Sequence, residues 1–473
     1  MKNRYFIILL ALLLILAGCS TKKAVTDPVN LWVVTEVTPS RGTNTQVQYY
    51  IDQFQNEHPN VSIELDILPY NEPQRGEYIK ELYDKIETGE GPDIYLLPDR
   101  DILQTDRSFV RVAPLFPDVE LAMRAGIFAD ISRLYNFDFR LGKSALQKTV
   151  MDAGVVNGSR YVLPLQYEIN TIYYYPDLFE EHAELDIDVC TVSKLMQFGI
   201  ENSTVAISSA IDHIPARSHY ALLETFSNLI DYDTGKIMLT AQELEEYLTT
   251  YQDFAKTLNG KWQIYGGVYL DNVEEIIDYA PIKANAMKGG IAFSAYAKQS
   301  GNTLKMAPLR TDDGDVIATV SYFGAIGSGC KDVKTAYEFL RIFLSEEAQW
   351  KTDYLNEPDL PPLTGYGWPV RAKGTAPYFY DTALKWLDRK EGSLLPKYKS
   401  LEITDQDLPL LETKIDIVRF HFCNSFYQRR QELNDYNNGA IPTDTDISVL
   451  ANSIIQDLKD TYTENLNDLP KIN

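Results

Sequence analysis

Cysteine is scarce in this chain of 473 residues, which has four: Cys19, Cys190, Cys330 and Cys423. Apart from Cys19, near the N-terminus, the other three are an odd number with no close spacing, so one disulfide is the most that can form. This excludes the dense disulfide framework that stabilises small secreted domains. We expect each of these three cysteines to be a buried free thiol.

Histidine is also rare, and its spacing does not suggest a metal site. The five histidines show no i, i+4 pair, and no pair of cysteines lies at zinc spacing. A G-x-S-x-G nucleophile elbow and a phosphate-binding Gly-rich loop are absent as well. We therefore predict no metal, no cofactor and no catalytic residue.

Positive charge is in deficit, because 44 Lys and Arg stand against 67 Asp and Glu, for a net charge of −23. A surface of this sign repels a phosphate backbone, so nucleic acid is excluded as a partner. The sequence shows neither an internal repeat nor a low-complexity block. We assign no function to the acidic balance, which indicates a solvated surface.

Long apolar runs are limited to one, at residues 5–16, which follows the positive charges of Lys2 and Arg4. It is too short to remain across a bilayer and is typical of a signal peptide. The next residues, Leu16-Ala17-Gly18-Cys19, resemble the lipobox of bacterial lipoproteins, in which the cysteine is acylated before cleavage. We predict that residues 1–18 are removed and that Cys19 is lipidated. The alternative is a plain secretory signal or a short anchor.

The remaining chain of about 450 residues is large enough for two lobes. Residues 19–27 are small, polar and charged, as in a flexible leash. Hydrophobic periodicity then predicts strands at 31–35, 61–67 and 93–97, separated by helices at 45–57 and 74–88. Such a β-α-β-α-β order indicates a mainly parallel, doubly wound sheet, whose ligands bind beyond the carboxyl ends of the strands.

Further strands and helices are expected along the rest of the chain. The last hundred residues have a mostly helical pattern. The expected strands are 161–165, 172–175, 290–293 and 316–326, and the expected helices are 333–344 and 346–354.

Several stretches, in order, resemble the extracellular solute-binding proteins of ABC importers, in the sugar-binding family that includes maltose-binding protein. Each motif is weak by itself, but their order over about 300 residues is specific. Pro176 stands where the family has asparagine. The matching stretches are HPNV at 58–61, GEGPDI at 89–94, GSRYVLPL at 158–165, IYYYPDLF at 172–179, AYEFL at 336–340 with SEEAQ at 345–349, and WPVR at 368–371.

The resemblance implies a two-lobed α/β fold like that of periplasmic binding proteins, with a mainly parallel doubly wound sheet in each lobe and a hinge of crossing strands. The family pattern places the crossings near residues 165–166 and 307–310. The expected division is 28–165 plus 310–355 for lobe one, and 166–309 plus 356–473 for lobe two.

The resemblance also indicates which residues face the ligand in the cleft between the lobes. A sugar needs planar aromatic rings to stack on and side chains that donate and accept hydrogen bonds. The alternatives are solvated surface charges for Asp99, Arg100 and Glu168, and core packing for the aromatic residues. The expected ligand-binding residues lie at strand ends, at crossings and in one loop: Glu36, Thr38, Asp99, Arg100, Tyr167, Glu168, Tyr296, Tyr322 and Trp368.

These features predict an extracellular lipoprotein, held at the outer face of the cell membrane through Cys19, that captures a solute and delivers it to ABC permease subunits. The resemblance favours a carbohydrate solute, a monomer and no catalysis. Two alternatives remain open: an exported glycan-degrading enzyme that uses two carboxylates, and a binder of a non-sugar solute such as a peptide or polyamine. Delivery to a sensor in place of a permease is a third.

Overall fold

A computed structural model gives the arrangement of most of the chain. The described residues are 28–36, 42–99, 102–104, 109–169, 171–174, 189, 191–202, 225–258, 282–283, 305–349, 368–371, 414–421 and 446–472. The signal peptide, the leash and the strand expected at 290–293 lie outside them. Among the described helices, none has the length and apolar character that a membrane span requires.

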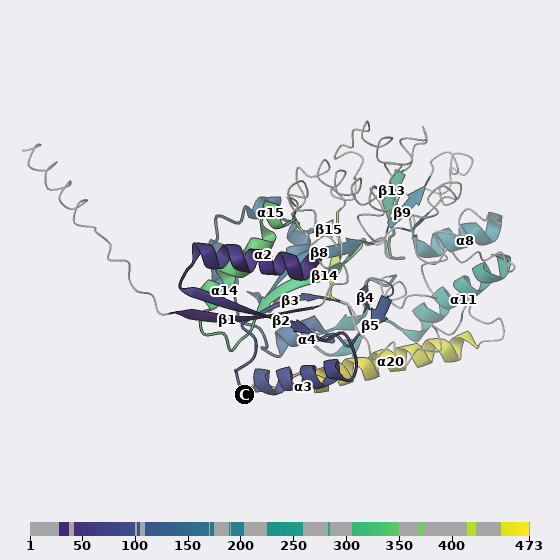
Figure 1. Cartoon of the computed structure of the whole chain (residues 1–473). Coiled ribbons are helices and arrows are strands. Elements are labelled where there is room, and N and C mark those ends of the chain that lie inside the picture. The colour runs from purple at the N-terminus through teal and green to yellow at the C-terminus, as the bar shows by residue number, and fades with distance from the viewer. Residues whose placement is uncertain are drawn as a thin grey trace, which may run out of the picture.

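The N-terminal part has the predicted β-α-β-α-β order (Figure 1). Strand β1 pairs in parallel with β2 over its whole length and with β3 through Val33 and Ile94. The alternating pattern of the sequence is therefore confirmed as a parallel sheet with helical crossovers. The elements are β1 (Val29–Glu36), α2 (Gly42–Glu57), β2 (Val61–Leu68), α3 (Gln74–Glu87) and β3 (Ile94–Pro98).

The main sheet continues beyond β3 with strands from distant parts of the sequence, in the order β15-β8-β14-β3-β1-β2, and β16 also pairs with β14. Strand β14 runs antiparallel to both β3 and β8. The sheet is thus mixed. Strands β1, β2 and β3, from which we predicted a parallel sheet, are parallel to one another. The added strands are β8 (Val162–Ile169), β14 (Ile317–Ile326), β15 (Trp368–Pro369) and β16 (Ile417–Arg419).

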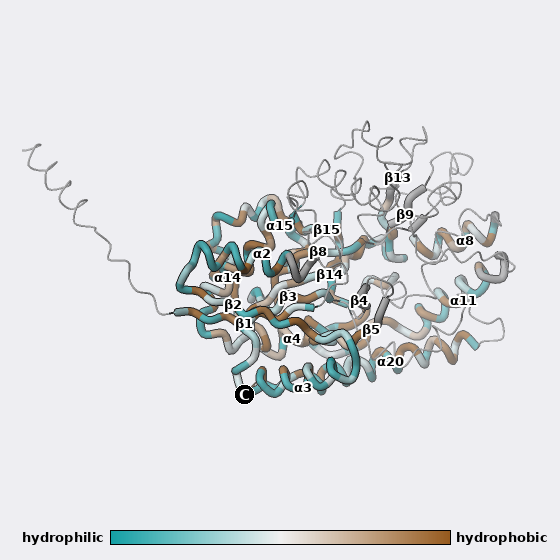
Figure 2. The backbone as a smooth tube through the Cα atoms, viewed as in Figure 1, coloured by the Kyte–Doolittle hydropathy of each residue, from teal (hydrophilic) through white to brown (hydrophobic). Residues whose placement is uncertain are grey.

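Two hydrophobic cores cover the two faces of this sheet. One contains apolar residues of α2 and of α14 (Val333–Leu340), and the other contains residues of α3 and α4 (Val119–Arg124). Figure 2 shows the hydrophobic segments gathered along the strands and the hydrophilic ones along the outer helical turns. Because both faces are covered, every residue of β14 is buried.

A third core builds the second lobe from helices α8 (Val192–Asn202), α11 (Ala241–Leu258) and part of α20 (Ile447–Asp468). A separate small sheet has the order β12-β9-β13, and its pairs are antiparallel. Strand β8 of the main sheet ends at Ile169, and strand β9 of the small sheet begins at Thr171. The strands of the small sheet are β9 (Thr171–Tyr174), β12 (Ile282–Lys283) and β13 (Lys305–Pro308).

Helix α20 belongs to both lobes. Asp446 caps its N-terminus, because its carboxylate accepts a hydrogen bond from the backbone N–H of Val449, and the 22 residues of the helix extend about 33 Å. Residues Ile454 and Leu458 pack in the core of the second lobe, whereas Leu469, just after the helix, packs against the sheet of the first. Figure 1 shows α20 running from beside α11 to beside α3. The C-terminal segment therefore connects the two lobes.

Short elements complete the described part of the chain. Cys330, the one expected thiol that is described, is a buried free cysteine. The first helix expected after β14 ends at Leu340, because a 3-10 turn follows it, and residues 350–354 of the second lie outside the described residues. The short elements are β4 (Ile102–Gln104), β5 (Phe109–Arg111), α5 (Ser132–Phe137), η1 (Lys143–Ala145), α6 (Lys148–Asp152), β6 (Val155–Val156), β7 (Ser159–Arg160), β10 (Ile230–Asp231), β11 (Lys236–Ile237), η4 (Arg341–Leu344) and α15 (Glu346–Gln349).

Candidate functional site

The carboxyl ends of β1, β3 and β8 meet at one edge of the main sheet, as the sequence predicted for a ligand site. Tyr322 of β14 pairs with Pro98 at the end of β3 and with Gln166 near the end of β8. Trp368 of β15 pairs with Tyr167. The structure therefore brings Tyr167, Tyr322 and Trp368 to the same edge as Asp99.

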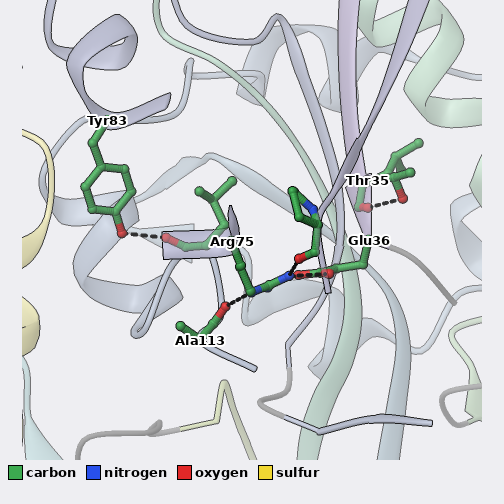
Figure 3. A network of polar contacts seen from close by, with 8 residues as sticks. Thr35, Glu36, Arg75, Tyr83 and Ala113 are labelled. Carbon is green, nitrogen blue, oxygen red and sulfur yellow. Dashed lines mark hydrogen bonds and ion pairs between the residues drawn. The ribbon is translucent and has the colours of Figure 1, made fainter. Parts of the chain in front are cut away.

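Glu36, at the end of β1, is held by a buried ion pair with Arg75 of α3 (Figure 3). The Arg75 guanidinium donates to both carboxylate oxygens of Glu36, and also to the carbonyls of Pro69 at 2.8 Å and Ala113 at 2.6 Å. Burial raises the pKa of the Glu36 carboxyl, and the hydrogen bond and charge of Arg75 partly offset this. Glu36 thereby fixes the loops around α3, and its contact with a ligand stays a prediction.

The three aromatic residues at the edge pack in the core. Tyr167, Tyr322 and Trp368 all belong to the core on the α2 face of the sheet. The Tyr322 hydroxyl donates to the carbonyl of Leu96 at 3.3 Å. Tyr167 is in phase with Leu163 and Leu165 along β8, a sequence signal for a core position. Ligand contact by these rings stays a prediction.

Asp99 is buried at the end of β3 and meets the chain that follows β16. Its Oδ2 atom accepts a hydrogen bond from the backbone N–H of His421 at 2.6 Å, and His421 Nδ1 lies 3.5 Å from the same oxygen. Its Oδ1 atom has no hydrogen-bond partner among the described residues. This carboxylate oxygen is therefore unpaired within the described residues, and the contact of Asp99 with a ligand stays a prediction.

Gln166 and Ser321 are two residues at this edge that the sequence did not identify. Both side chains are 0% exposed. Within the described residues, the amide nitrogen and oxygen of Gln166 have no hydrogen-bond partner, and the same is true of the Ser321 hydroxyl. A register shift in β14 lies between Val320 and Tyr322, so Ser321 is a bulge residue. No pattern in the sequence reveals a β-bulge, although Gln166 in an apolar strand was a signal.

Buried polar atoms without a partner are rare in proteins, because each costs about 1–3 kcal/mol. Here an amide, a hydroxyl and a carboxylate oxygen come from neighbouring strands β8, β14 and β3 at the edge where those strands approach the second lobe. These unpaired donors and acceptors mark this end of the sheet as the candidate site. Among the described residues, no group of His, Cys, Asp and Glu could hold a metal ion.

Asp118 and Tyr232 connect the lobes beside this site. Asp118 caps α4 by accepting from the backbone N–H of Leu121 at 3.0 Å, and it accepts from the Tyr232 hydroxyl at 2.9 Å. Burial raises the pKa of Asp118 to about 7, although these hydrogen bonds act in the opposite direction. Next to it, Arg124 of α4 forms an ion pair with Asp233 at 2.7 Å. These contacts join α4 to the β10–β11 hairpin.

The remaining predicted residues divide into one that is described and several that are not. Glu168 is half-buried in β8 and pairs in register with Thr319. Its contact with a ligand stays a prediction. Thr38, Arg100, Tyr296 and the lipidation site Cys19 lie outside the described residues.

Replacing Arg75 tests the buried ion pair. Arg75→Met leaves the Glu36 carboxylate buried without its partner, so we expect the free energy of unfolding to fall by about 3–5 kcal/mol in urea denaturation. Because burial then favours the protonated Glu36, the loss should grow as the pH rises above the unfolded pKa of glutamate. Lys148→Met, which removes the exposed ion pair with Asp152, is the control and should have little effect. Equal effects of the two substitutions would contradict this role.

Asp118 should give stability a pH dependence. Its pKa is higher in the folded chain (about 7) than its ordinary value of 3.8, so stability should decrease as the pH rises between these values. Asp118→Asn retains an acceptor for Leu121 and should flatten this part of the profile. Asp130→Asn is the control of opposite sign: burial raises the pKa of Asp130, but hydrogen bonds from Ser132 and Ser159 lower it overall. Thermal melts across this range measure both, and an unchanged slope in Asp118→Asn would contradict the expectation.

Comparisons with known proteins agree with this geometry. Residues 39–350 match the family model described as bacterial extracellular solute-binding protein. No curated protein matches the chain in sequence. The similar solved structures share 12–15% identity, which shows the fold alone.

Three of these structures cover nearly the whole chain. The sugar-binding protein MalE from Xanthomonas citri has a TM-score of 0.57 at 12% identity and covers 92% of this chain and 98% of its own. The lacto-N-biose-bound galacto-N-biose/lacto-N-biose I-binding protein of an ABC transporter from Bifidobacterium longum has 0.54 at 14% identity, with 94% and 99% covered. A family 1 extracellular solute-binding protein from Alicyclobacillus acidocaldarius has 0.54 at 13%, with 92% and 99% covered.

The comparisons confirm the predicted two-lobed α/β fold. They also support a solute-binding role in ABC transport and a location outside the cytoplasm, extracellular or periplasmic. The family match spans well over half of the 473 residues. The chain therefore belongs to the bacterial extracellular solute-binding protein family.

Proposed function

We propose that this protein captures an oligosaccharide, or a related polyol, in the cleft between its lobes and delivers it to an ABC permease. In this proposal it acts as a monomer, carries out no chemistry, and is tethered to the outer face of the membrane by lipid on Cys19. The solute-binding role follows from the family. The carbohydrate and the lipid anchor are the proposed parts.

The unpartnered polar atoms of Gln166, Ser321 and Asp99 are the observation that carries the carbohydrate proposal. A sugar hydroxyl both donates and accepts hydrogen bonds. It can therefore donate to the Asp99 carboxylate oxygen while it accepts from the Gln166 amide. A ligand that forms hydrogen bonds with these atoms removes the free-energy cost of burying them without partners. The free energy recovered in this way contributes to the affinity of the ligand.

Two structural neighbours are described as sugar binders, the Xanthomonas citri and Bifidobacterium longum proteins. They support the solute class without identifying it. A peptide or polyamine remains the alternative solute, and the cleft carboxylate Asp99 would suit the amines of a polyamine.

A glycan-degrading enzyme is the second alternative. Retaining and inverting glycosidases need two carboxyl groups on either side of the glycosidic bond. The buried carboxylates at or near the site include Glu36, paired with Arg75, Asp99, bound by the His421 backbone, and Asp118, which caps α4. Each therefore has a structural partner, which favours binding over catalysis.

Titration calorimetry with a panel of oligosaccharides tests the proposal at Gln166. Gln166→Leu removes an unpaired buried amide, so the ligand-free protein should keep or gain stability, whereas affinity should fall about 10-fold to 100-fold. Gln349→Leu is the matched control, because the Gln349 amide donates to the carbonyls of Leu165 and Phe343. That variant should lose stability and retain its affinity.

The same panel distinguishes the alternatives. Tyr296→Ala should also weaken binding if its ring stacks on the sugar. Recovery of the intact oligosaccharide after incubation would argue against hydrolysis. If no sugar of the panel binds but a polyamine or peptide does, the carbohydrate proposal is excluded. Unchanged affinity in Gln166→Leu would instead place the site elsewhere in the cleft.

The anchor has a separate test. Cys19→Ala removes the thiol that would be acylated, so we expect the protein to leave the lipidated membrane fraction. Cell fractionation with radioactive palmitate measures this, and wild-type protein is the positive control. Label in the Cys19→Ala variant equal to that in wild type would contradict the assignment of Cys19.

A further inference from the structure

Two aromatic rings of the first lobe project into solvent beside α5. The side chains of Phe137 and Phe139 are 69% and 85% exposed, the two highest values among the large apolar residues described. They border a surface hollow of about 460 Å³. The hollow is lined by Arg133, Leu134, Phe137, Asp138, Phe139, Arg140, Lys334, Tyr337 and Glu338, which we call the Phe137 face.

The surroundings hold these rings outward. Asp138, between the two phenylalanines, is buried, accepts from the Tyr337 hydroxyl at 3.4 Å, and lies 3.7 Å from Arg341. On the adjacent turn, the ammonium of Lys143 donates to the carbonyl of Asn136 at 2.8 Å. Asp138 is therefore held inward, whereas the rings on either side of it are exposed.

The charge of the Phe137 face is opposite to that of the whole chain. The face has three cations, Arg133, Arg140 and Lys334, against two carboxylates, the half-buried Glu338 and the buried Asp138, which lies 3.6 Å from Arg140, so its net charge is positive. The chain carries a net charge of −23. A basic surface with exposed aromatic rings on an acidic protein matches an anionic lipid surface, in which the rings enter the headgroup boundary and the cations remain near phosphate.

The Phe137 face lies at the end of the first lobe where the chain enters it. Helix α14, which carries Lys334 and Tyr337, follows β14, whose last residue pairs with Ile94 at the start of β3. Val29 at the start of β1 lies at this same end, four residues before β1 meets β3. Figure 1 shows α14 and the beginning of β1 at one end of the sheet.

The length of the chain before β1 limits how far this end of the lobe can lie from a lipid on Cys19. Residues 19–27 can extend to about 30 Å at most. A lipid on Cys19 therefore keeps this end of the lobe within about 30 Å of the bilayer. Lys22 and Lys23 in the same segment add positive charge close to the lipid.

We propose that the Phe137 face is a second, weak membrane contact that rests on anionic lipid and orients the tethered protein. The proposal relies on the lipid anchor of the proposed function. The strand ends that carry Gln166 and Asp99 lie at the opposite edge of the same sheet, about 26 Å away along β1. In this orientation the candidate site faces away from the bilayer, toward arriving solute, and the weak contact must release before the cleft can meet the permease of the proposed function.

Cosedimentation with vesicles tests the contact without the lipid anchor. The protein is the mature chain from residue 19 with Cys19→Ala, and the vesicles contain phosphatidylcholine with or without phosphatidylglycerol. We expect measurable binding only with the anionic lipid, decreasing as salt is added. Phe137→Ser/Phe139→Ser and Arg133→Glu/Arg140→Glu should each reduce the bound fraction about tenfold.

Matched controls change equally exposed residues elsewhere. Val449→Ser/Leu466→Ser removes two exposed apolar side chains of α20, and Lys194→Glu/Lys459→Glu reverses two exposed cations of the second lobe. Neither should change vesicle binding. Circular dichroism and ligand titration confirm that each variant is folded.

Several outcomes would overturn the proposal. They are equal binding to neutral and anionic vesicles, unchanged binding in the Phe137→Ser/Phe139→Ser variant, or the same loss in the α20 control. Ultracentrifugation that shows a dimer, dissociated by the same phenylalanine changes, would assign the face to a second copy of the chain. Because this chain has no lipid, the vesicle result is independent of the Cys19→Ala fractionation and of sugar binding.

Discussion

The fold of the first lobe depends on the return of β14 from the second lobe into the middle of its sheet. All ten residues of β14 are buried, with one core on each face. The strand lies between β3 and β8 and runs against both, so it connects the N-terminal β-α-β-α-β unit to the segment that leads to the other lobe. The same pairing sets Ser321 beside Gln166 and Asp99. The candidate site is therefore a consequence of how the lobes are joined.

Much of this arrangement could be predicted from the sequence. The strands and helices up to β3 follow from periodicity, because each buries one face or both. The edge of the sheet also follows, because parallel strands place their carboxyl ends together. The resemblance to solute-binding proteins supplied the two lobes, which periodicity alone does not show. Asp99 was proposed in this way; its Oδ1 atom has no partner among the described residues, and its contact with a ligand stays a prediction.

Other features depend on long-range pairing that local patterns do not contain. Glu36 was expected at the ligand, but whether a carboxylate at a strand end meets Arg75 depends on the position of α3 in space. Tyr167 and Tyr322 were chosen by position, and the alternation of each strand directs them into the core. Gln166 and Ser321 became apparent only from a shifted register and from the absence of partners among the described residues. Satisfaction of hydrogen bonds is a property of the folded chain.

The reach of α20 across both lobes has a consequence for how the protein is made. Ile454 and Leu458 complete the core of the second lobe, while Leu469 completes one face of the first. These residues are among the last to be synthesised, so neither core is fully covered until the C-terminus is available. Domains usually fold as their chain emerges, N-terminal part first. In this chain α20 follows the other described parts of both lobes, so the two lobes complete their cores together and not one after the other.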